Sequence, residues 1–227
     1  MLLEKKGIQV NKTNSNGKTP LSKAASEGHN EIVKMLLERE DILVNKADNN
    51  GYTPLIWAAY NGNDQVVKML LAKEEIQENQ FDKYGHTPLI LAAYKGYDNI
   101  VEMLLEKENI QVNQPQFQDV SPLHFAAGHG HVRVVELLLE REDIQVNMAS
   151  IVGATPLLIA AQSGRGKVVK LLLKKEGIVV NQADSAGATP ISVAADRRYG
   201  KIVDLLLGTE EIKALGWDGW RPIATPA

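Results

Sequence analysis

The chain has 227 residues and a net charge of −3 at neutral pH, and it contains no cysteine. Without cysteine it has no disulfides, thiolate zinc sites or cysteine nucleophile, and the acidic balance argues against a nucleic-acid-binding protein, which usually needs a basic surface. No apolar run approaches the ~20 residues that a helix needs to cross a bilayer, and the first residues do not resemble a signal peptide. We therefore expect a soluble, cytoplasmic protein, with a nuclear fraction left open, that binds neither nucleic acid nor membrane.

Two short motifs recur along the chain at intervals of 34 residues. The first is a Thr/Ser-Pro-Leu/Ile box, whose prolines are Pro20, Pro54, Pro88, Pro122, Pro156 and Pro190. The second is an asparagine, usually preceded by valine, found at Asn11, Asn45, Asn79, Asn113, Asn147 and Asn181. Because two independent markers keep the same register, the sequence predicts an array of repeats rather than one globular core.

Each repeat has the pattern of a helix, a tight turn, a second helix and an extended finger. Thr53 followed by Pro54 is typical of an N-cap and the first residue of a short helix, and Gly62 supplies the left-handed residue that ends it. The stretch QVVKMLL then carries an apolar stripe wide enough for a helix that packs against two neighbours. An I-x-V-N segment and a turn such as Asp48–Gly51 close the repeat. Since helix pairs this short cannot bury their apolar faces alone, we expect successive pairs to stack.

The repeats predict a single array over residues 1–227. It begins with a partial repeat over residues 1–18 and ends with a degenerate, truncated seventh repeat over residues 216–227. Between them lie six helix-pair units, over residues 19–52, 53–86, 87–120, 121–154, 155–188 and 189–215. The first residues align with the middle of a second helix, and neither end carries a polar capping repeat. We therefore expect a fragment of a longer array, in which Trp217 and Trp220 fold over the last apolar face.

Two positions depart from the repeat pattern. Asp119 stands where the other fingers have glycine, and Arg198 replaces the glycine between the two helices of the last unit. Because aspartate tolerates left-handed geometry better than most residues, a regular turn remains compatible with Asp119. At Arg198 we expect local strain.

The repeat pattern resembles that of ankyrin-repeat proteins. The family pattern D-x-x-G-x-T-P-L-H-x-A-A-x-x-G-H is visible in Asp48–Asn63 and recurs over nearly the whole chain. The resemblance implies an all-α ankyrin-repeat solenoid of stacked helix-turn-helix units with short β-turn fingers. Tetratricopeptide repeats share the 34-residue period but lack the Thr-Pro-Leu helix start and the finger. The units here are one residue longer than the usual ankyrin unit of about 33 residues. With endings similar to LLLEKEGIxVN, they resemble arrays found in large fungal multidomain proteins.

No catalytic or cofactor-binding constellation emerges from the sequence. The stretch Gly164–Lys167 is similar to part of a phosphate-binding loop but lacks its first glycine and its final Ser/Thr. His124, His129 and His131 could in principle ligate zinc, yet the repeat pattern already accounts for His124 and His131. We therefore predict no catalytic residue, no metal site and no cofactor.

Comparison of the six units within the chain separates scaffold positions from variable ones. The variable positions are those around the finger turn and those flanking Ala-Ala on the first helix, which by the resemblance line a concave, partner-facing surface. Seven of the twelve aromatic residues fall there, one at the end of unit one and the others in units two to four. They are Tyr52, Trp57, Tyr60, Tyr84, Tyr94, Phe117 and Phe125, and His86, Lys95 and His129 add polar edges. Since Tyr and Trp are enriched at binding hot spots, we predict a protein-binding surface; the alternative is that these rings only pack against the adjacent finger.

These observations predict a non-enzymatic protein-protein interaction module with a concave, aromatic-centred surface. We expect the partner to be another protein, and we expect no small-molecule substrate. A first alternative is a regulatory or recruiting segment of a larger multidomain enzyme or signalling protein. A second is a structural spacer. We expect a monomer, with weak self-association through the uncapped ends as the competing possibility.

Overall fold

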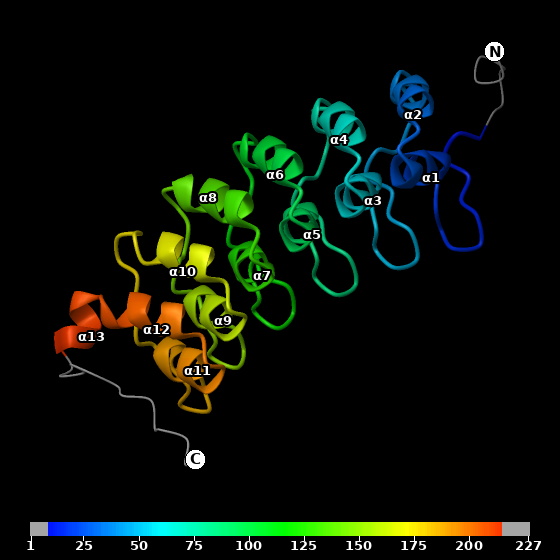
Figure 1. The fold of residues 1–227 in the computed structure, drawn as a ribbon. Helices are drawn as coiled ribbons and strands as arrows, with labels where there is room; N and C mark the ends of the chain where they lie inside the picture. Colours follow the sequence, from blue (N-terminus) through cyan, green and yellow to red (C-terminus); the bar gives the residue numbers. More distant parts are fainter. Residues whose placement is uncertain (1–8, 215–227) are drawn as a thin grey trace. The chain divides into compact units, whose positions relative to one another are not determined.

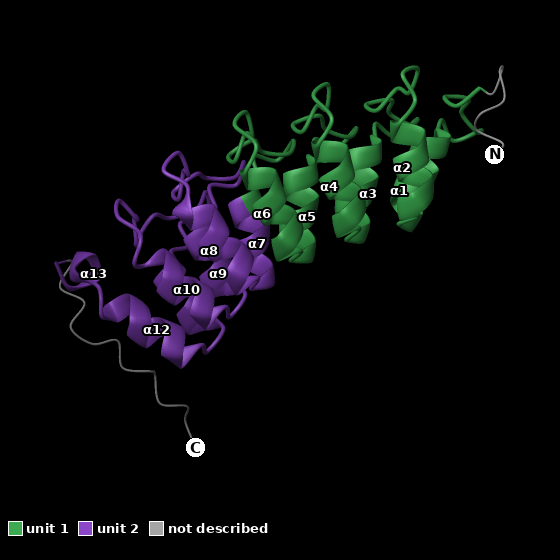
Figure 2. Ribbon diagram, turned by 90° about the horizontal axis from the view of Figure 1, so that it is seen from above, with its two compact units in different colours: residues 1–122 green, residues 123–227 purple. Residues whose placement is uncertain are grey.

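The structure is a computed structural model that describes residues 9–214. The predicted start within a helix, the degenerate seventh repeat and the cap formed by Trp217 and Trp220 lie outside these residues. Residues 9–214 form thirteen helices and no strand, which confirms the predicted all-α repeat fold (Figure 1). The helices fall into two compact units, Met1–Pro122 and Leu123–Ala227, each of which contains several of the helix-pair repeats (Figure 2). From here on, "first unit" and "second unit" mean these two, and they are described separately.

All helices of the two units except the last occur as pairs. The first unit contains α1 (Pro20–Glu27), α2 (Asn30–Leu37), α3 (Pro54–Asn61), α4 (Asp64–Leu71), α5 (Pro88–Lys95) and α6 (Asp98–Leu105). The second contains α7 (Pro122–His129), α8 (Val132–Glu140), α9 (Pro156–Gln162), α10 (Gly166–Leu172), α11 (Pro190–Asp196), α12 (Gly200–Leu207) and α13 (Glu210–Ala214). The first helix of every pair begins at the proline of the Thr/Ser-Pro box.

The helices of the first unit pack in two rows. The first helices α1, α3 and α5 contact one another in sequence, and the second helices α2, α4 and α6 do the same (Figure 1). Leu55, Ile56, Ala58 and Ala59 of α3 are completely or almost completely buried between the neighbouring pairs. The small alanines allow neighbouring first helices to approach closely, so the core runs continuously through the stack.

Local sequence rules explain where the first helices begin and end. The Thr53 hydroxyl accepts a hydrogen bond from the Ile56 amide at 3.1 Å, and Pro54 occupies the first turn, where no amide is needed. Gly62 ends the helix with φ of 75°. A side chain at Gly62 would also collide with the ring of Tyr97 from the next repeat, whose Cζ would lie 2.8 Å from an added Cβ. Gly62 therefore satisfies both a backbone and a packing requirement.

The recurring asparagines connect successive fingers. The Asn45 side chain donates to the carbonyl of Glu75 at 2.6 Å and accepts from the amide of Gln77 at 3.0 Å. Asn11, Asn79 and Asn147 make the same pair of bonds to their own next repeat. A carboxamide is suited to this position because it carries a donor and an acceptor on one short side chain. This bonding explains the second 34-residue marker.

Helix α13 is an element that the sequence pattern did not predict. It stands in place of the last finger, and its Glu211 carboxylate accepts from the amides of Val180 and Asn181 at 3.0 and 3.1 Å. These bonds satisfy backbone groups of the preceding finger, as the asparagines do elsewhere.

The two positions that depart from the repeat pattern both adopt left-handed geometry. Asp119 has φ of 56°, and its amide donates to Gln116 at 2.9 Å, the same bond that Gly51 makes to Asp48. The regular turn expected at Asp119 is therefore present. Arg198 has φ of 60°, which agrees with the expected strain, because a side chain with a Cβ is unfavourable in this region.

Replacing Arg198 with glycine is expected to raise the free energy of unfolding by about 0.5–1 kcal/mol, because relief of the left-handed strain exceeds the entropic cost of glycine. Urea denaturation followed by circular dichroism measures the change. The matched control is Arg197→Gly, since Arg197 is exposed but has φ of −84°. That control should be neutral or destabilising; equal stabilisation by both variants would contradict a role for the φ angle.

Candidate functional site

Eight of the ten residues predicted to form the binding surface lie in the first unit, and Trp57 of α3 is central among them. The Trp57 ring lies 4.6 Å from the ring of Tyr52 and 6.5 Å, edge to face, from that of Tyr60. The ammonium of Lys18, from the preceding finger, lies 3.3 Å above the Trp57 ring. The rings are contributed by a finger and a first helix, which brings two of the predicted variable regions together.

Two buried aspartates hold these rings in place. Trp57 Nε1 donates to the Asp48 carboxylate at 3.0 Å, and the same carboxylate accepts from the backbone amides of Asn50 and Tyr52. The Tyr52 hydroxyl interacts with the Asp82 carboxylate of the next finger. Burial, followed by the nearby Asp82 carboxylate, raises the pKa of Tyr52 to about 12, so the phenol keeps its proton at an alkaline pH at which an ordinary tyrosine begins to ionise.

Asp82 also organises the finger that follows. Its carboxylate accepts from the amides of Tyr84 and His86 at 2.8 and 2.9 Å, and His86 Nδ1 lies 3.0 Å from its second oxygen. The His86 ring is 5.9 Å from that of Tyr84, a ring that Lys83 covers at 5.0 Å. Tyr84 therefore projects from a finger whose backbone is held by the buried Asp82 carboxylate.

The other edge of the cluster lies on α5. The Lys95 ammonium is 4.6 Å from the Tyr60 ring and 5.4 Å from the Tyr94 ring, so it bridges adjacent repeats. Tyr94 remains 38% exposed and Tyr84 52% exposed, whereas Tyr52 and Trp57 are only partly accessible. We call the whole set the aromatic surface. It consists of Lys18, Tyr52, Trp57, Tyr60, Lys83, Tyr84, His86, Tyr94 and Lys95.

Phe117 lies next to the aromatic surface and is paired with Phe81, which sequence reasoning missed. The two rings are 6.4 Å apart in an edge-to-face arrangement, with exposures of 66% and 50%. The Phe117 amide lies 3.5 Å from the carbonyl of Tyr84, so this phenylalanine pair adjoins Tyr84. Phe81 precedes the finger turn, outside the positions considered variable, although other repeats have Thr13, Ala47 or Pro115 there. Comparing this position between repeats could have identified Phe81 from the sequence. Lys18 and Lys83 were also missed, and only their contacts with the rings assign them to the site.

The remaining two predicted residues, Phe125 and His129, belong to the second unit. His129 Nδ1 lies 3.0 Å from the carbonyl of Phe125, and its ring stacks on that of His131 at 5.8 Å. His124 is buried, with Nε2 3.0 Å from the Ala154 carbonyl, and burial lowers its pKa. No group of three or more histidine, aspartate or glutamate side chains within residues 9–214 is placed to hold a metal ion.

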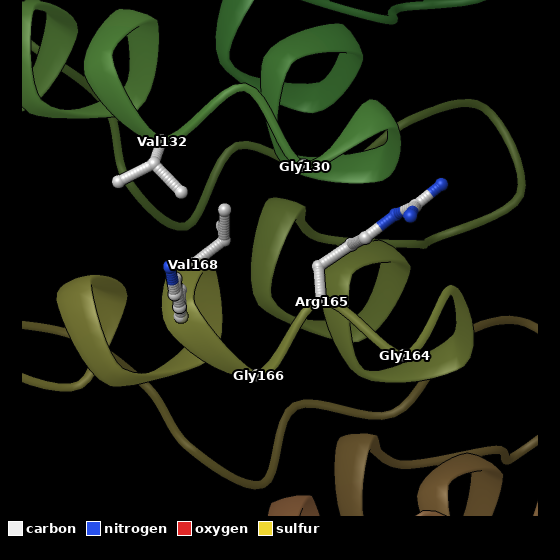
Figure 3. A pocket seen from close by; sticks show the side chains of 7 residues that line it. Gly130, Val132, Gly164, Arg165, Gly166 and Val168 are labelled. Carbon is white, nitrogen blue, oxygen red and sulfur yellow. The ribbon is translucent and has the colours of Figure 1, made fainter.

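The glycine-rich stretch of the second unit borders a pocket. Gly130, Val132, Gly164, Arg165, Gly166, Lys167 and Val168 line it (Figure 3). Figure 3 shows the Arg165 side chain pointing away from Val132 and Val168, and its Nε donates to the Gly128 carbonyl at 2.9 Å. The guanidinium therefore serves the packing of adjacent repeats, and its orientation does not favour phosphate binding in the pocket.

No helix among the described residues is both long enough and apolar enough to span a membrane. The family model described as "Ankyrin repeats (3 copies)" matches the chain over residues 1–82, 41–116, 77–150 and 123–215. Among solved structures, the crystal structure of EF0377, an ankyrin repeat protein, is similar with a TM-score of 0.79 and 26% identity. That similarity covers 87% of this chain and 100% of the other. A search of the curated proteins finds no significant match.

Proposed function

The chain belongs to the ankyrin-repeat family, and we propose that it acts as a non-enzymatic protein-binding module through its aromatic surface. Ankyrin repeats are generally protein-protein interaction modules and typically non-catalytic scaffolds. We assign the contact with the partner protein to the first helices and fingers of the first unit, where most of the predicted aromatic residues lie.

The observation that carries this proposal is the combination of fixed and exposed rings. The Trp57 indole is hydrogen-bonded to Asp48 and the Tyr52 hydroxyl interacts with Asp82, so both rings are held in place. Tyr84 and Tyr94 present large areas to solvent beside these rings. A surface whose backbone and central rings are already ordered loses little entropy on binding, and Tyr and Trp are enriched among residues that dominate binding energy.

The test is a selection of displayed random 12-residue peptides on the immobilised chain, followed by measurement of the Kd of enriched peptides. We expect the triple variant Tyr60→Ala/Tyr84→Ala/Tyr94→Ala to bind these peptides about 30-fold or more weakly, since hot-spot residues each contribute more than about 1 kcal/mol. Trp57 is left unchanged because its loss would also disturb Asp48.

The matched control is Ile32→Ala/Leu43→Ala, which removes side chains that are 43% and 52% exposed in the same unit but outside the aromatic surface. It should bind like the wild type, and all three proteins should have equal helicity. Retention of binding by the triple tyrosine variant would place recognition elsewhere and leave the rings as packing residues. Failure of the wild type to enrich any peptide would count against the proposed function itself.

A further inference from the structure

Three lysines lie against the rings of the aromatic surface. Lys18 covers Trp57, Lys83 covers Tyr84, and Lys95 lies over both Tyr60 and Tyr94. If the aromatic surface binds a protein, as proposed above, the chemistry of these lysines defines the partner. We infer that this surface binds an acidic peptide segment, in which carboxylates pair with the three lysines and an apolar side chain contacts the phenylalanine pair.

These lysines are not held in ion pairs within the described part of the chain, although the charges of Asp48 and Glu27 act on Lys18 and Lys83 donates to the Asn50 side chain at 2.6 Å. None of the three forms a salt bridge there, whereas Lys23 is paired with Glu27 and Arg39 with Asp41. The two aspartates beneath the aromatic surface, Asp48 and Asp82, are buried and already accept several hydrogen bonds each. Because both carboxylates are buried, the charges that the aromatic surface presents to solvent are those of its three lysines, although the chain carries a net charge of −3.

The contacts between lysines and rings favour carboxylates over purely apolar ligands. An apolar side chain could reach the covered ring faces only by displacing the ammonium groups, which are attracted to those faces. A carboxylate can bind the outward N–H groups of the same ammonium and leave the contact with the ring intact. Beside Lys83 and Tyr84, the exposed phenylalanine pair offers an uncharged neighbouring contact for an apolar side chain.

Single-stranded nucleic acid is the competing ligand, because it also combines anions with flat rings. Nucleic acid is disfavoured because the aromatic surface has three lysines and no arginine. Proteins that bind single-stranded nucleic acid rely on a long cationic groove that follows the phosphate backbone. A labelled oligonucleotide therefore belongs in the test as a separate arm.

The experiment uses the same library of random 12-residue peptides and sequences those that the wild-type chain enriches. We expect an excess of Asp and Glu over the unselected library. The triple variant Lys18→Gln/Lys83→Gln/Lys95→Gln should bind the most enriched peptides about 10-fold more weakly, because each exposed ion pair contributes modestly to affinity. Replacing Asp and Glu in these peptides by Asn and Gln should weaken binding to the wild-type chain by a similar factor. The charge-conserving variant Lys18→Arg/Lys83→Arg/Lys95→Arg should retain most of the affinity.

The outcomes separate this inference from the proposed function. Neutral or basic peptides that still require Tyr60, Tyr84 and Tyr94 would overturn the acidic partner but leave the aromatic surface as the binding site. Equal loss of affinity in the glutamine and arginine variants would also overturn it, since lysine packing rather than charge would then matter. Tighter binding of a fluorescein-labelled 20-residue oligouridylate than of any enriched peptide would reassign the ligand class. No enrichment by the wild type would overturn both proposals.

Discussion

Replacing Asp82 with alanine is expected to lower the free energy of unfolding by about 3 kcal/mol, because one buried carboxylate satisfies several donors at once. Asp82 is 1% exposed and accepts from the amides of Tyr84 and His86, while the His86 ring and the Tyr52 hydroxyl also contact it. Without it, these partly buried donors lose a charged acceptor. Urea denaturation followed by circular dichroism measures the change.

Asp184 is the matched control for Asp82, because it occupies the equivalent position in a later finger. Among the described residues its carboxylate accepts only from the backbone amides of Ala186 and Ala188 and is bonded to no side chain, and Asp184 is only partly buried. Asp184→Ala should therefore cost about 1 kcal/mol, the ordinary cost of losing a turn or cap interaction. Equal losses in the two variants would show that the contacts of Asp82 to the aromatic surface contribute nothing to stability.

Replacing Leu89 with alanine is expected to cost about 3 kcal/mol, because it removes a side chain packed between neighbouring helix pairs and leaves a cavity. Leu89 lies in α5, is 1% exposed, and follows the proline that begins the helix. Helix α5 packs against α3 and α6, so relaxation of α5 around the cavity would disturb its contacts to both helices. The measurement is again urea denaturation.

The control for Leu89→Ala is Leu43→Ala, which removes the same atoms from a side chain that is half exposed. That variant should change the free energy of unfolding by less than about 0.5 kcal/mol, as is usual for surface substitutions. A comparable loss at Leu43, or a negligible loss at Leu89, would contradict the position of the core between the helix pairs.

Much of the fold was predictable because its signals are local. The hydroxyl of Thr53, the ring of Pro54 and the left-handed φ of Gly62 act within a few residues of one another. Asp119 could be expected to form a normal turn for the same reason. Helix α13 could not be expected, because the bonds of its Glu211 to the amides of Val180 and Asn181 join two repeats and become visible only when adjacent fingers are seen together.

For the candidate site, the sequence identified most residues but not their arrangement. The absence of aromatic residues from the equivalent positions of the first and the last two repeats drew attention to Tyr52, Trp57 and Tyr60. It did not show that Asp82 contacts Tyr52, or that Phe81 pairs with Phe117. Such contacts join different repeats, and nothing in the spacing of a single repeat specifies them.

By itself, the sequence determined the repeat period, the helix starts and ends, and the buried apolar faces, because these follow from backbone geometry and from hydrophobic periodicity over short distances. The tertiary structure alone decided which side chains meet across repeats. The contacts of Lys18 with Trp57 and of Lys95 with Tyr60 depend on how far one helix pair is displaced from the next. That displacement results from the packing of the helix pairs within the first unit, so the charge and exposure of the aromatic surface emerge only when these repeats are assembled.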